Sequence, residues 1–540
     1  MRIFFRNKFF SNHAIHFLNA TQFLGALNDN IVKYLVVFFL IQFKGQEFTS
    51  KILFLVGIIY VIPFLLFSSA AGMLADRFSK QRLILILKCS EIFITFITFF
   101  AFSLRSEMSC YLLLFFLSIH SAAFGPPKYS IIPELVKPNA ISKANGLIVS
   151  STYLAIIFGT FLSSFIAQIT NFNPFWCALL PFFIALIGFV TSVMIPYTKT
   201  KKTHTFINPF FPYEIYQTLK ICKNTPHLLT IIFASAFFLF TGAFFQLNII
   251  PFSMNSLHLN QIGGGYLFLS TSLGIATGSF IAGRLSKKRV EIGLSCIAAF
   301  FLALSFLLLP FSSVSIVLVF ILLAFLGLAG GLFIVPLDTF VQTYSPEESR
   351  GRIIAAANFL SFFGVFIAPI LLYVLNAFLQ FSAATSFFLI GWVILGVFLC
   401  MLFRFAKEVF HFIGNFFLKS FIISSLPAEE NILVLHPFSL KIYFLLFGLA
   451  PKTQFYLISN KPTFRESVLS FFSAYKIVYI EKNSVPSLHY LYKRIKEQKK
   501  EDEYSCLILQ KSLFDSHQEA FSDPLLFIKR EGKAIQFLPL

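Results

Sequence analysis

The stretch Gln22-Phe-Leu-Gly-Ala-Leu-Asn-Asp-Asn-Ile-Val-Lys33 lies inside an apolar run that is long enough to cross a bilayer. Its carboxylate, Asp29, stands between two amides, Asn28 and Asn30. An ionised aspartate at the centre of a membrane helix costs about 2.5–3.5 kcal/mol on insertion scales, so such a group normally faces a wet cavity or a partner. We therefore expect Asp29 to be a functional residue. The alternatives are an aspartate at the membrane edge, one that caps a broken helix, or one that is neutralised by Lys33 one turn further on.

The composition of the chain is that of a multi-pass membrane protein. Of its 540 residues, 57% are hydrophobic and only 12% are charged, whereas soluble domains contain about 25% charged residues. Basic loops that fix topology and lie against anionic lipid explain the formal net charge of +19. The seven cysteines are scattered and form no C-x-x-C pair. We expect no nucleic-acid partner, no disulfide framework, no metal site and no cofactor.

Twelve apolar runs predict twelve membrane helices. Basic residues gather in alternate loops, so the positive-inside rule places both termini in the cytoplasm. The longest connection, residues 197–225, is predicted to be a cytoplasmic linker between two six-helix halves, residues 1–196 and 226–405. The predicted spans are 15–43, 52–75, 82–104, 109–128, 144–170, 174–196, 226–252, 264–283, 290–310, 314–337, 353–378 and 384–404.

An internal repeat supports the division into halves. The loop after the second run, residues 72–82, corresponds to the loop after the eighth, residues 283–289, and Asp76 aligns with Gly283. The loops after the fourth and tenth runs also correspond, because each contains Pro-Glu followed by Ala-Asn. Repeated halves are typical of transporters, which bind substrate at the interface between the repeats near the bilayer midplane.

The loop sequence Gly72-x-x-x-Asp76-Arg77-x-x-Lys80-x-Arg82 resembles the G-x-x-x-D-R-x-G-R-R-R motif of the major facilitator superfamily, with Ser79 in place of a glycine. The resemblance implies an all-α, twelve-helix membrane fold. It also implies that the acid pairs with arginines or a helix terminus of the other half and so latches one conformation. The alternative is an ordinary basic loop. The predicted latch consists of Gly72, Asp76, Arg77, Lys80, Arg82, Arg284 and Arg350.

Four further segments resemble the lysophospholipid transporter branch of that superfamily: residues 23–30, 125–135, 144–146 and 345–352. The resemblance covers about residues 15–405. It implies a secondary transporter in the cell inner membrane that moves a lysophospholipid, such as 2-acyl-glycerophosphoethanolamine, toward the cytoplasm. In many relatives the transporter is fused to an acyltransferase that re-acylates the imported lysolipid.

The polar residues of the chain suit such a cargo. Asp29 is expected to pair with an ammonium headgroup or a coupling cation, and Lys128 to hold the phosphate, although Lys128 is equally explained as a positive-inside anchor. Lys88 and Glu91 are three residues apart in one predicted helix, which favours a structural ion pair. The other residues expected to meet the glycerol hydroxyls or to line the opposite wall are Gln22, Asn28, Asn30, Gln246 and Asn248.

The tail is predicted to form an interfacial helix over residues 406–428 and a small cytoplasmic α/β domain over 429–540. Strands are expected near 431–435, 455–458, 476–480 and 506–509. This order resembles the first part of a glycerophosphate acyltransferase domain, in which the aspartate of H-x-x-x-x-D orients a histidine as general base. Here His436 is followed by Lys441, and residues 509–511 lack the later P-E-G segment. We therefore expect a degenerate domain without catalytic residues, either a regulatory remnant or a docking domain that holds a separate acyltransferase.

Three other functions stay open at this point. Since fold does not specify cargo, the chain is also consistent with a carrier of another amphiphile, drug or metabolite. The second is a membrane-tethered acyltransferase, which predicts acyl transfer by the tail that is lost in His436→Ala. The third is a scaffold that transports nothing.

Overall fold

The computed structural model describes membrane helices, a linker helix and six strands. The described residues are 13–45, 48–198, 211–259, 261–286, 290–413, 432–436, 453–459, 475–479, 504–510, 525–531 and 534–539. The chain forms two compact units, residues 1–290 with 298–397, and residues 291–297 with 398–540.

Twelve helices in the described part of the chain are long and apolar enough to cross a membrane, which confirms the predicted number of spans. The first six are α2 (Ala14–Lys44), α3 (Thr49–Arg77), α4 (Lys80–Ser103), α5 (Glu107–Ser130), α7 (Ile141–Ile169) and α8 (Pro174–Val193). The second six are α10 (Leu228–Ser256), α11 (Gln261–Leu285), α12 (Ile292–Leu308), α13 (Ile316–Tyr344), α14 (Arg350–Tyr373) and α15 (Ala383–Arg404). Shorter helical elements are α6 (Ile132–Leu135), η2 (Pro138–Ala140), η3 (Leu309–Val314) and η4 (Val374–Phe378).

Local sequence sets several helix ends. The side chain of Ser79 accepts a hydrogen bond from the backbone N–H of Arg82 at 3.5 Å and so caps the start of α4. Asn173 caps α8 in the same way, at 3.1 Å from the N–H of Phe175. Gly45 ends α2 with a φ of 104°, a conformation that glycine adopts without strain. These caps satisfy backbone groups that a helix leaves unpaired at its ends.

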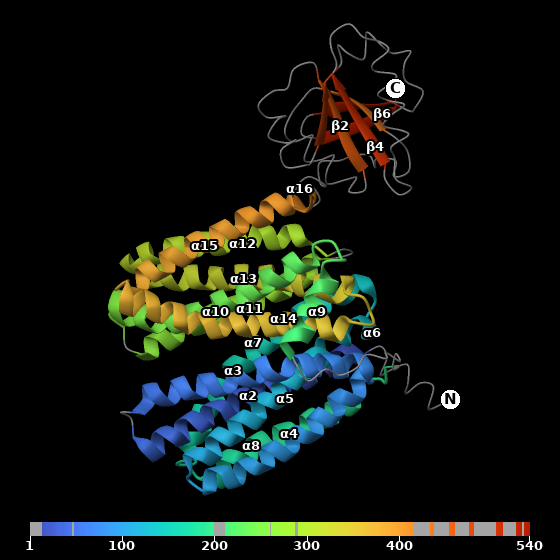
Figure 1. The fold of residues 1–540 in the computed structure, drawn as a ribbon. Helices are drawn as coiled ribbons and strands as arrows, with labels where there is room; N and C mark the ends of the chain where they lie inside the picture. Colours follow the sequence, from blue (N-terminus) through green and yellow to red (C-terminus); the bar gives the residue numbers. More distant parts are fainter. Residues whose placement is uncertain are drawn as a thin grey trace. The chain divides into compact units, whose positions relative to one another are not determined.

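The helices pack as two sets of six (Figure 1). In the first set, α2 packs on α7 and α8, and α3 packs on α5. In the second set, α11 packs on α13, and α10 packs on α14. The two sets meet mainly where α3 contacts α14 and where α7 contacts α11. Below, these sets are called the first half and the second half.

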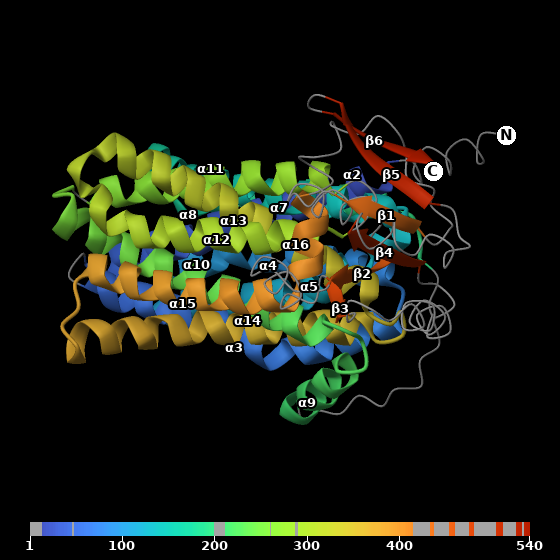
Figure 2. The ribbon, with the colours of Figure 1, turned by 90° about the horizontal axis from the view of Figure 1, so that it is seen from above.

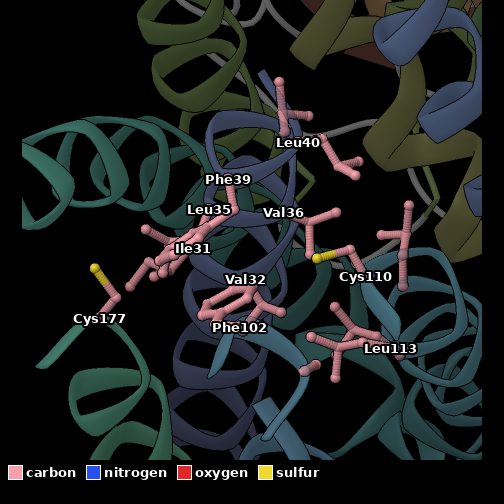
Figure 3. Close-up of a cluster of buried hydrophobic side chains, with 14 of the residues drawn as sticks. Ile31, Val32, Leu35, Val36, Phe39, Leu40, Phe102, Cys110, Leu113 and Cys177 are labelled. Carbon is pink, nitrogen blue, oxygen red and sulfur yellow. The ribbon is translucent and has the colours of Figure 1, made fainter. Parts of the chain in front are cut away.

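A buried apolar cluster fixes the position of α2 in the first half. Figure 3 shows one face of α2, from Ile31 to Leu40, packed against side chains of α4, α5 and α8. Within it, the ring of Phe39 stacks on that of Phe102 with centroids 4.2 Å apart. Asp29 is the central residue of this continuous 31-residue helix, so the alternative of a capping residue in a broken helix is wrong.

The linker contains a helix that the sequence analysis did not predict. Residues 199–210 lie outside the described part, but Phe211–Cys222 form α9, which contacts α3 and α14 (Figure 2). Only the beginning of the predicted interfacial helix is described, as α16 (Ala406–Ile413).

The tail contains a six-stranded sheet in the order β3-β2-β4-β1-β5-β6. The first five strands are parallel, and β5 and β6 are antiparallel. The segments between the strands, including Lys441 and the predicted helices, lie outside the described residues, so the α/β character of this domain and its degenerate motifs stay predictions. The strands are β1 (Ile432–His436), β2 (Thr453–Ser459), β3 (Tyr475–Tyr479), β4 (Tyr504–Gln510), β5 (Leu525–Glu531) and β6 (Ala534–Pro539).

Candidate functional site

A cavity of about 390 Å³ lies between the two halves. Its walls come from α2, α3, α4, α5 and α7 of the first half and from α10, α13 and α14 of the second. Four of the predicted ligands line it, namely Gln22, Asp29, Asn30 and Lys128. The polar lining residues that the sequence analysis did not assign to the site include Tyr60, Lys88, His120, Ser121, Asp338 and Asn358.

Only one of the two carboxylate oxygens of Asp29 has a hydrogen-bond partner in the described structure. Its Oδ2 accepts a hydrogen bond from Ser121 Oγ at 2.6 Å, while its buried Oδ1 has no hydrogen-bond partner in the described structure. Lys33 forms no ion pair with it in the described part of the chain; its Nζ lies 4.9 Å from the ring centroid of Tyr34 and 5.2 Å from that of Tyr60. The alternative in which Lys33 neutralises Asp29 through a direct ion pair is therefore wrong, and Lys33 acts on the carboxylate only through space. The carboxylate keeps one acceptor available beside the cavity.

The two amides that flank Asp29 have different surroundings. Asn30 lines the cavity and donates to the backbone oxygen of Ala26 at 2.7 Å. Asn28 is fully buried and does not line the cavity, because its Nδ2 donates to Glu91 Oε1 at 2.9 Å. Asn28 and Asn30 are two positions apart, so their side chains point about 200° from each other around α2 and do not face the same space. This corrects the expectation that Asn28 meets cargo.

Lys88 and Glu91 form the predicted structural ion pair, with Nζ and Oε2 2.5 Å apart and both side chains almost fully buried. Two groups join them from neighbouring helices: Asn28, and His120, whose Nε2 lies 3.7 Å from Glu91 Oε2. Lys88 and His120 also line the cavity. A charged pair that sits directly behind the cavity wall is thus neutralised within the first half.

Gln22 and Gln246 also differ in their placement. Gln22 lines the cavity, and its Nε2 donates to Thr152 Oγ1 at 3.1 Å. Gln246 is exposed on α10 and is not among the residues that line the cavity, which corrects its expected place on the opposite wall. Asn248 does not line the cavity either, because it is buried and donates to the backbone oxygen of Ala383.

Lys128 is a second buried cation of the cavity and, unlike Lys88, it has no ion-pair partner in the described structure. It lies in the last turn of α5, and its Nζ lies 4.2 Å from the ring centroid of Tyr129. Asp29 and Asp338 both act on it electrostatically, yet neither forms an ion pair with it within 4 Å in the described structure. An ammonium that is buried without a direct counter-ion is costly, so this group is suited to an anionic ligand.

Asp338 is the main residue that sequence reasoning missed. The predicted tenth span ended at residue 337, which placed Asp338 in a loop, whereas α13 continues to Tyr344. Asp338 therefore lies inside the helix and faces the same cavity as Asp29. An acidic residue two positions after Pro336 was the available signal, because a proline inside a membrane helix does not have to end it.

The predicted latch lies at the end of the bundle where the basic loops gather. Asp76 accepts hydrogen bonds from the backbone N–H of Gly351 at 2.6 Å and of Arg352 at 2.9 Å, at the start of α14. Its Oδ2 also lies 3.6 Å from Arg352 Nε. The carboxylate thus sits on the N-terminus of a helix from the other half, where its charge is favoured.

Of the other latch residues, Gly72 and Arg350 also lie where the two halves meet, while the rest make contacts within their own half in the described structure. Lys80 pairs with Glu134 at 2.5 Å, and Gly72 packs against α14, where an added Cβ would lie 2.8 Å from Gly351 O. Arg350 is buried beside Asp76 and lines a second cavity of about 610 Å³ at this end. Arg77, Arg82 and Arg284 lie over the rings of Phe78, Tyr197 and Phe280, respectively.

A second contact between the halves joins α7 to α11 and α13. Asn145 donates to Thr339 Oγ1 at 3.0 Å and to Gln342 Oε1 at 3.1 Å, and accepts from Gln342 Nε2 at 3.0 Å. One residue on, Gly146 lies against the backbone of α11, where an added Cβ would lie 2.9 Å from the Cα of Gly283. Together with Asp76, this contact closes the end of the bundle that carries the basic loops.

No group of three or more His, Cys, Asp or Glu side chains in the described part of the chain is arranged to hold a metal ion. The chemistry of the cavity is instead that of two carboxylates, one free ammonium and several amides and hydroxyls, surrounded by aromatic and aliphatic side chains. Such a cavity can bind an amphiphile with both charges in its headgroup.

Comparison with known proteins agrees with this architecture. The family model described as Major Facilitator Superfamily matches residues 18–369. The chain is 25% identical over 360 residues to the lysophospholipid transporter LplT of Citrobacter koseri, which covers 63% of this chain and 82% of that relative. It is 28% identical over 148 residues to LplT of Photorhabdus laumondii, which covers 27% of this chain and 35% of that relative.

Among solved structures, the human organic anion transporter MFSD10 (TETRAN) matches with a TM-score of 0.60 at 16% sequence identity. The match covers 73% of this chain and 99% of that one, and it shows a shared fold. The family match over more than half of the chain, the twelve helices and the two junctions lead to one conclusion. The chain belongs to the Major Facilitator Superfamily.

Proposed function

We propose that this protein is a secondary transporter that moves a lysophospholipid, such as 2-acyl-glycerophosphoethanolamine, across the inner membrane toward the cytoplasm by alternating access. The observation that carries the proposal is the carboxylate of Asp29, which lies at the midpoint of α2 and lines the cavity between the halves with one oxygen unpartnered in the described structure. A polar group held at such a depth is expensive and typically serves a substrate pathway.

The charges of the cavity match the two ends of an ethanolamine headgroup. The unpartnered Asp29 oxygen accepts hydrogen bonds from the ammonium, and Lys128 holds the phosphate as a point charge. Gln22 and Asn30 line the same space and offer amides to the glycerol hydroxyl. Aromatic and aliphatic lining residues, among them Phe64, Phe238 and Phe362, suit the acyl chain.

The conformation fits one stage of an alternating-access cycle. The hydrogen bonds of Asp76 and Asn145 join the halves at the end where the basic loops gather. If the basic loops are cytoplasmic, as the positive-inside rule indicates, the cytoplasmic end is closed in this state. Cargo that enters the cavity from the other side of the membrane, or from its outer leaflet, would then be released by opening these contacts.

Uptake by reconstituted protein tests the proposal. Labelled lysophosphatidylethanolamine is offered to proteoliposomes that contain the wild type, Asp29→Asn, or the control Glu107→Gln, which removes an exposed ion pair with Lys44 at a helix end. We expect uptake by the wild type and the control, and a rate at least about tenfold lower in Asp29→Asn, because a charge-assisted hydrogen bond contributes about 1.5–3 kcal/mol. Absence of wild-type uptake, or an unchanged rate in Asp29→Asn, would contradict the proposal.

The same preparation separates the rival functions. A carrier of another amphiphile would transport that compound while leaving lysophospholipid outside. An acyltransferase would produce re-acylated lipid in the presence of an acyl donor, and this product would disappear in His436→Ala. We expect no such product, and we assign the tail to the docking of a separate acyltransferase.

A further inference from the structure

Asp338 is an acidic residue of the second half that the proposed function does not yet use. It lies on α13, is half-buried and lines the cavity. The structure describes no hydrogen bond and no ion pair for its carboxylate. Its electrostatic neighbours are Lys128, Tyr129 and Tyr153, all from the first half.

The free ammonium of Lys128 stands in the field of two carboxylates from different halves. Asp29 approaches from α2 and Asp338 from α13, and both interact with Lys128 through space. Neither comes within the 4 Å of an ion pair, although all three groups line one cavity. Opposite charges that share a cavity without touching leave room for a ligand that supplies the missing contacts.

We infer that Asp338 is a cargo-binding residue of the second half, and that Asp338 and Asp29 together hold the primary ammonium of a zwitterionic headgroup while Lys128 holds its phosphate. This inference rests on the proposed function. A primary ammonium has three N–H donors and can therefore serve both carboxylates at once. Each of these hydrogen bonds is charge-assisted, which makes it stronger than a neutral one.

The division of the two carboxylates between the halves gives the headgroup a bridging role. Cargo with an ammonium connects α2 of the first half with α13 of the second. Cargo whose headgroup has only the phosphate charge leaves both carboxylates uncompensated, which disfavours it in a cavity of this kind. Asp338 is therefore a specificity-determining residue as well as a binding residue.

The simpler explanation is that Asp338 only balances the charge of Lys128. Under that explanation, removal of the Asp338 charge would change the uptake of every lysophospholipid by the same factor. Under the inference, it changes the uptake of ammonium-bearing cargo selectively. The ratio of two cargoes that share one acyl chain separates the two explanations.

The experiment measures initial uptake of lysophosphatidylethanolamine and lysophosphatidylglycerol by proteoliposomes. The variants are Asp338→Asn, Asp338→Glu and the control Glu107→Gln. We expect the ethanolamine-to-glycerol ratio to fall about tenfold in Asp338→Asn, which corresponds to one charge-assisted hydrogen bond. Asp338→Glu, which keeps the charge, and Glu107→Gln are expected to retain a ratio near that of the wild type.

An unchanged ratio in Asp338→Asn would overturn the inference while leaving the proposed function intact. Absence of uptake of both lipids by the wild type would overturn both. Should Asp338→Asn fail to fold, Asp338→Ser provides a second neutral variant with a smaller side chain. The ratio is internal to each preparation, so differences in the amount of reconstituted protein do not affect it.

Discussion

Two junctions close the same end of the bundle, and they do so with different chemistry. In one, the end of α3 meets the start of α14, and the Asp76 carboxylate accepts two backbone hydrogen bonds from Gly351 and Arg352. In the other, the end of α11 meets the start of α7, and Gly283 lies against Gly146. The internal repeat aligns Asp76 with Gly283, so equivalent positions carry a charge in one junction and no side chain in the other.

The two junctions are therefore expected to be weakened by different kinds of substitution. The α3–α14 junction depends on a charge at a helix N-terminus and is weakened when that charge is removed. The α7–α11 junction depends on the close approach of two backbones and is weakened mainly by added volume. The hydrogen bonds of Asn145 to Thr339 and Gln342 supplement the second junction with uncharged groups. Three substitutions test these assignments.

The largest effect is expected from Gly146→Val. An added Cβ would lie 2.5 Å from the backbone oxygen of Ser279, and neither backbone can yield without separating the helices. Overpacking typically costs about 1–3 kcal/mol and occasionally more, and a 2.5 Å contact with backbone belongs at the upper end of that range or beyond it, so we expect lysophospholipid uptake to fall at least about tenfold. The matched control is Gly57→Val on α3, because no atom lies within 4 Å of a Cβ at that position. Equal uptake by the two variants would show that the close approach is unimportant.

A smaller effect is expected from Asp76→Ala. The substitution leaves the N–H groups of Gly351 and Arg352 without their acceptor. A hydrogen bond to a charged group contributes about 1.5–3 kcal/mol to stability. We expect the closed end to open more often, which a cysteine at Ser142 would report as faster alkylation. Asp76→Asn keeps one acceptor oxygen and should lie between Asp76→Ala and the parent. An alkylation rate equal to that of the parent in both variants would refute the role of the charge.

The smallest of the three effects is expected from Asn145→Ala. It removes neutral hydrogen bonds, each of which contributes about 0.5–1.5 kcal/mol, and it leaves the amide of buried Gln342 unpaired. We expect the alkylation rate of the Ser142→Cys thiol to rise by less than it does in Asp76→Ala. The reverse order would mean that the uncharged junction, rather than Asp76, holds this end closed.

Hydropathy alone was sufficient to predict the twelve helices. A segment that crosses the bilayer must pair its backbone N–H and C=O groups internally, so a long apolar run forms a helix. The loop motif led to Asp76 and to the kind of partner it has, a helix terminus of the other half, but not to the particular N–H groups of Gly351 and Arg352. Asp338 was not predicted as a site residue because the predicted helix ended at residue 337, one position before it. The separation of Asn28 from Asp29 depends on how α2 is rotated against α4, which no sequence pattern specified.

The most direct test asks whether cargo beside Asp29 opens the closed end. In a background without the seven native cysteines, Ser142→Cys places a thiol at a buried position of the α7–α11 junction. Purified protein is treated with a maleimide in the presence and absence of lysophosphatidylethanolamine, with and without Asp29→Asn. We expect the lipid to accelerate alkylation several-fold when Asp29 is present and to have no effect in Asp29→Asn. An unchanged rate with Asp29, or the same acceleration without it, would contradict a cargo-driven opening through this carboxylate.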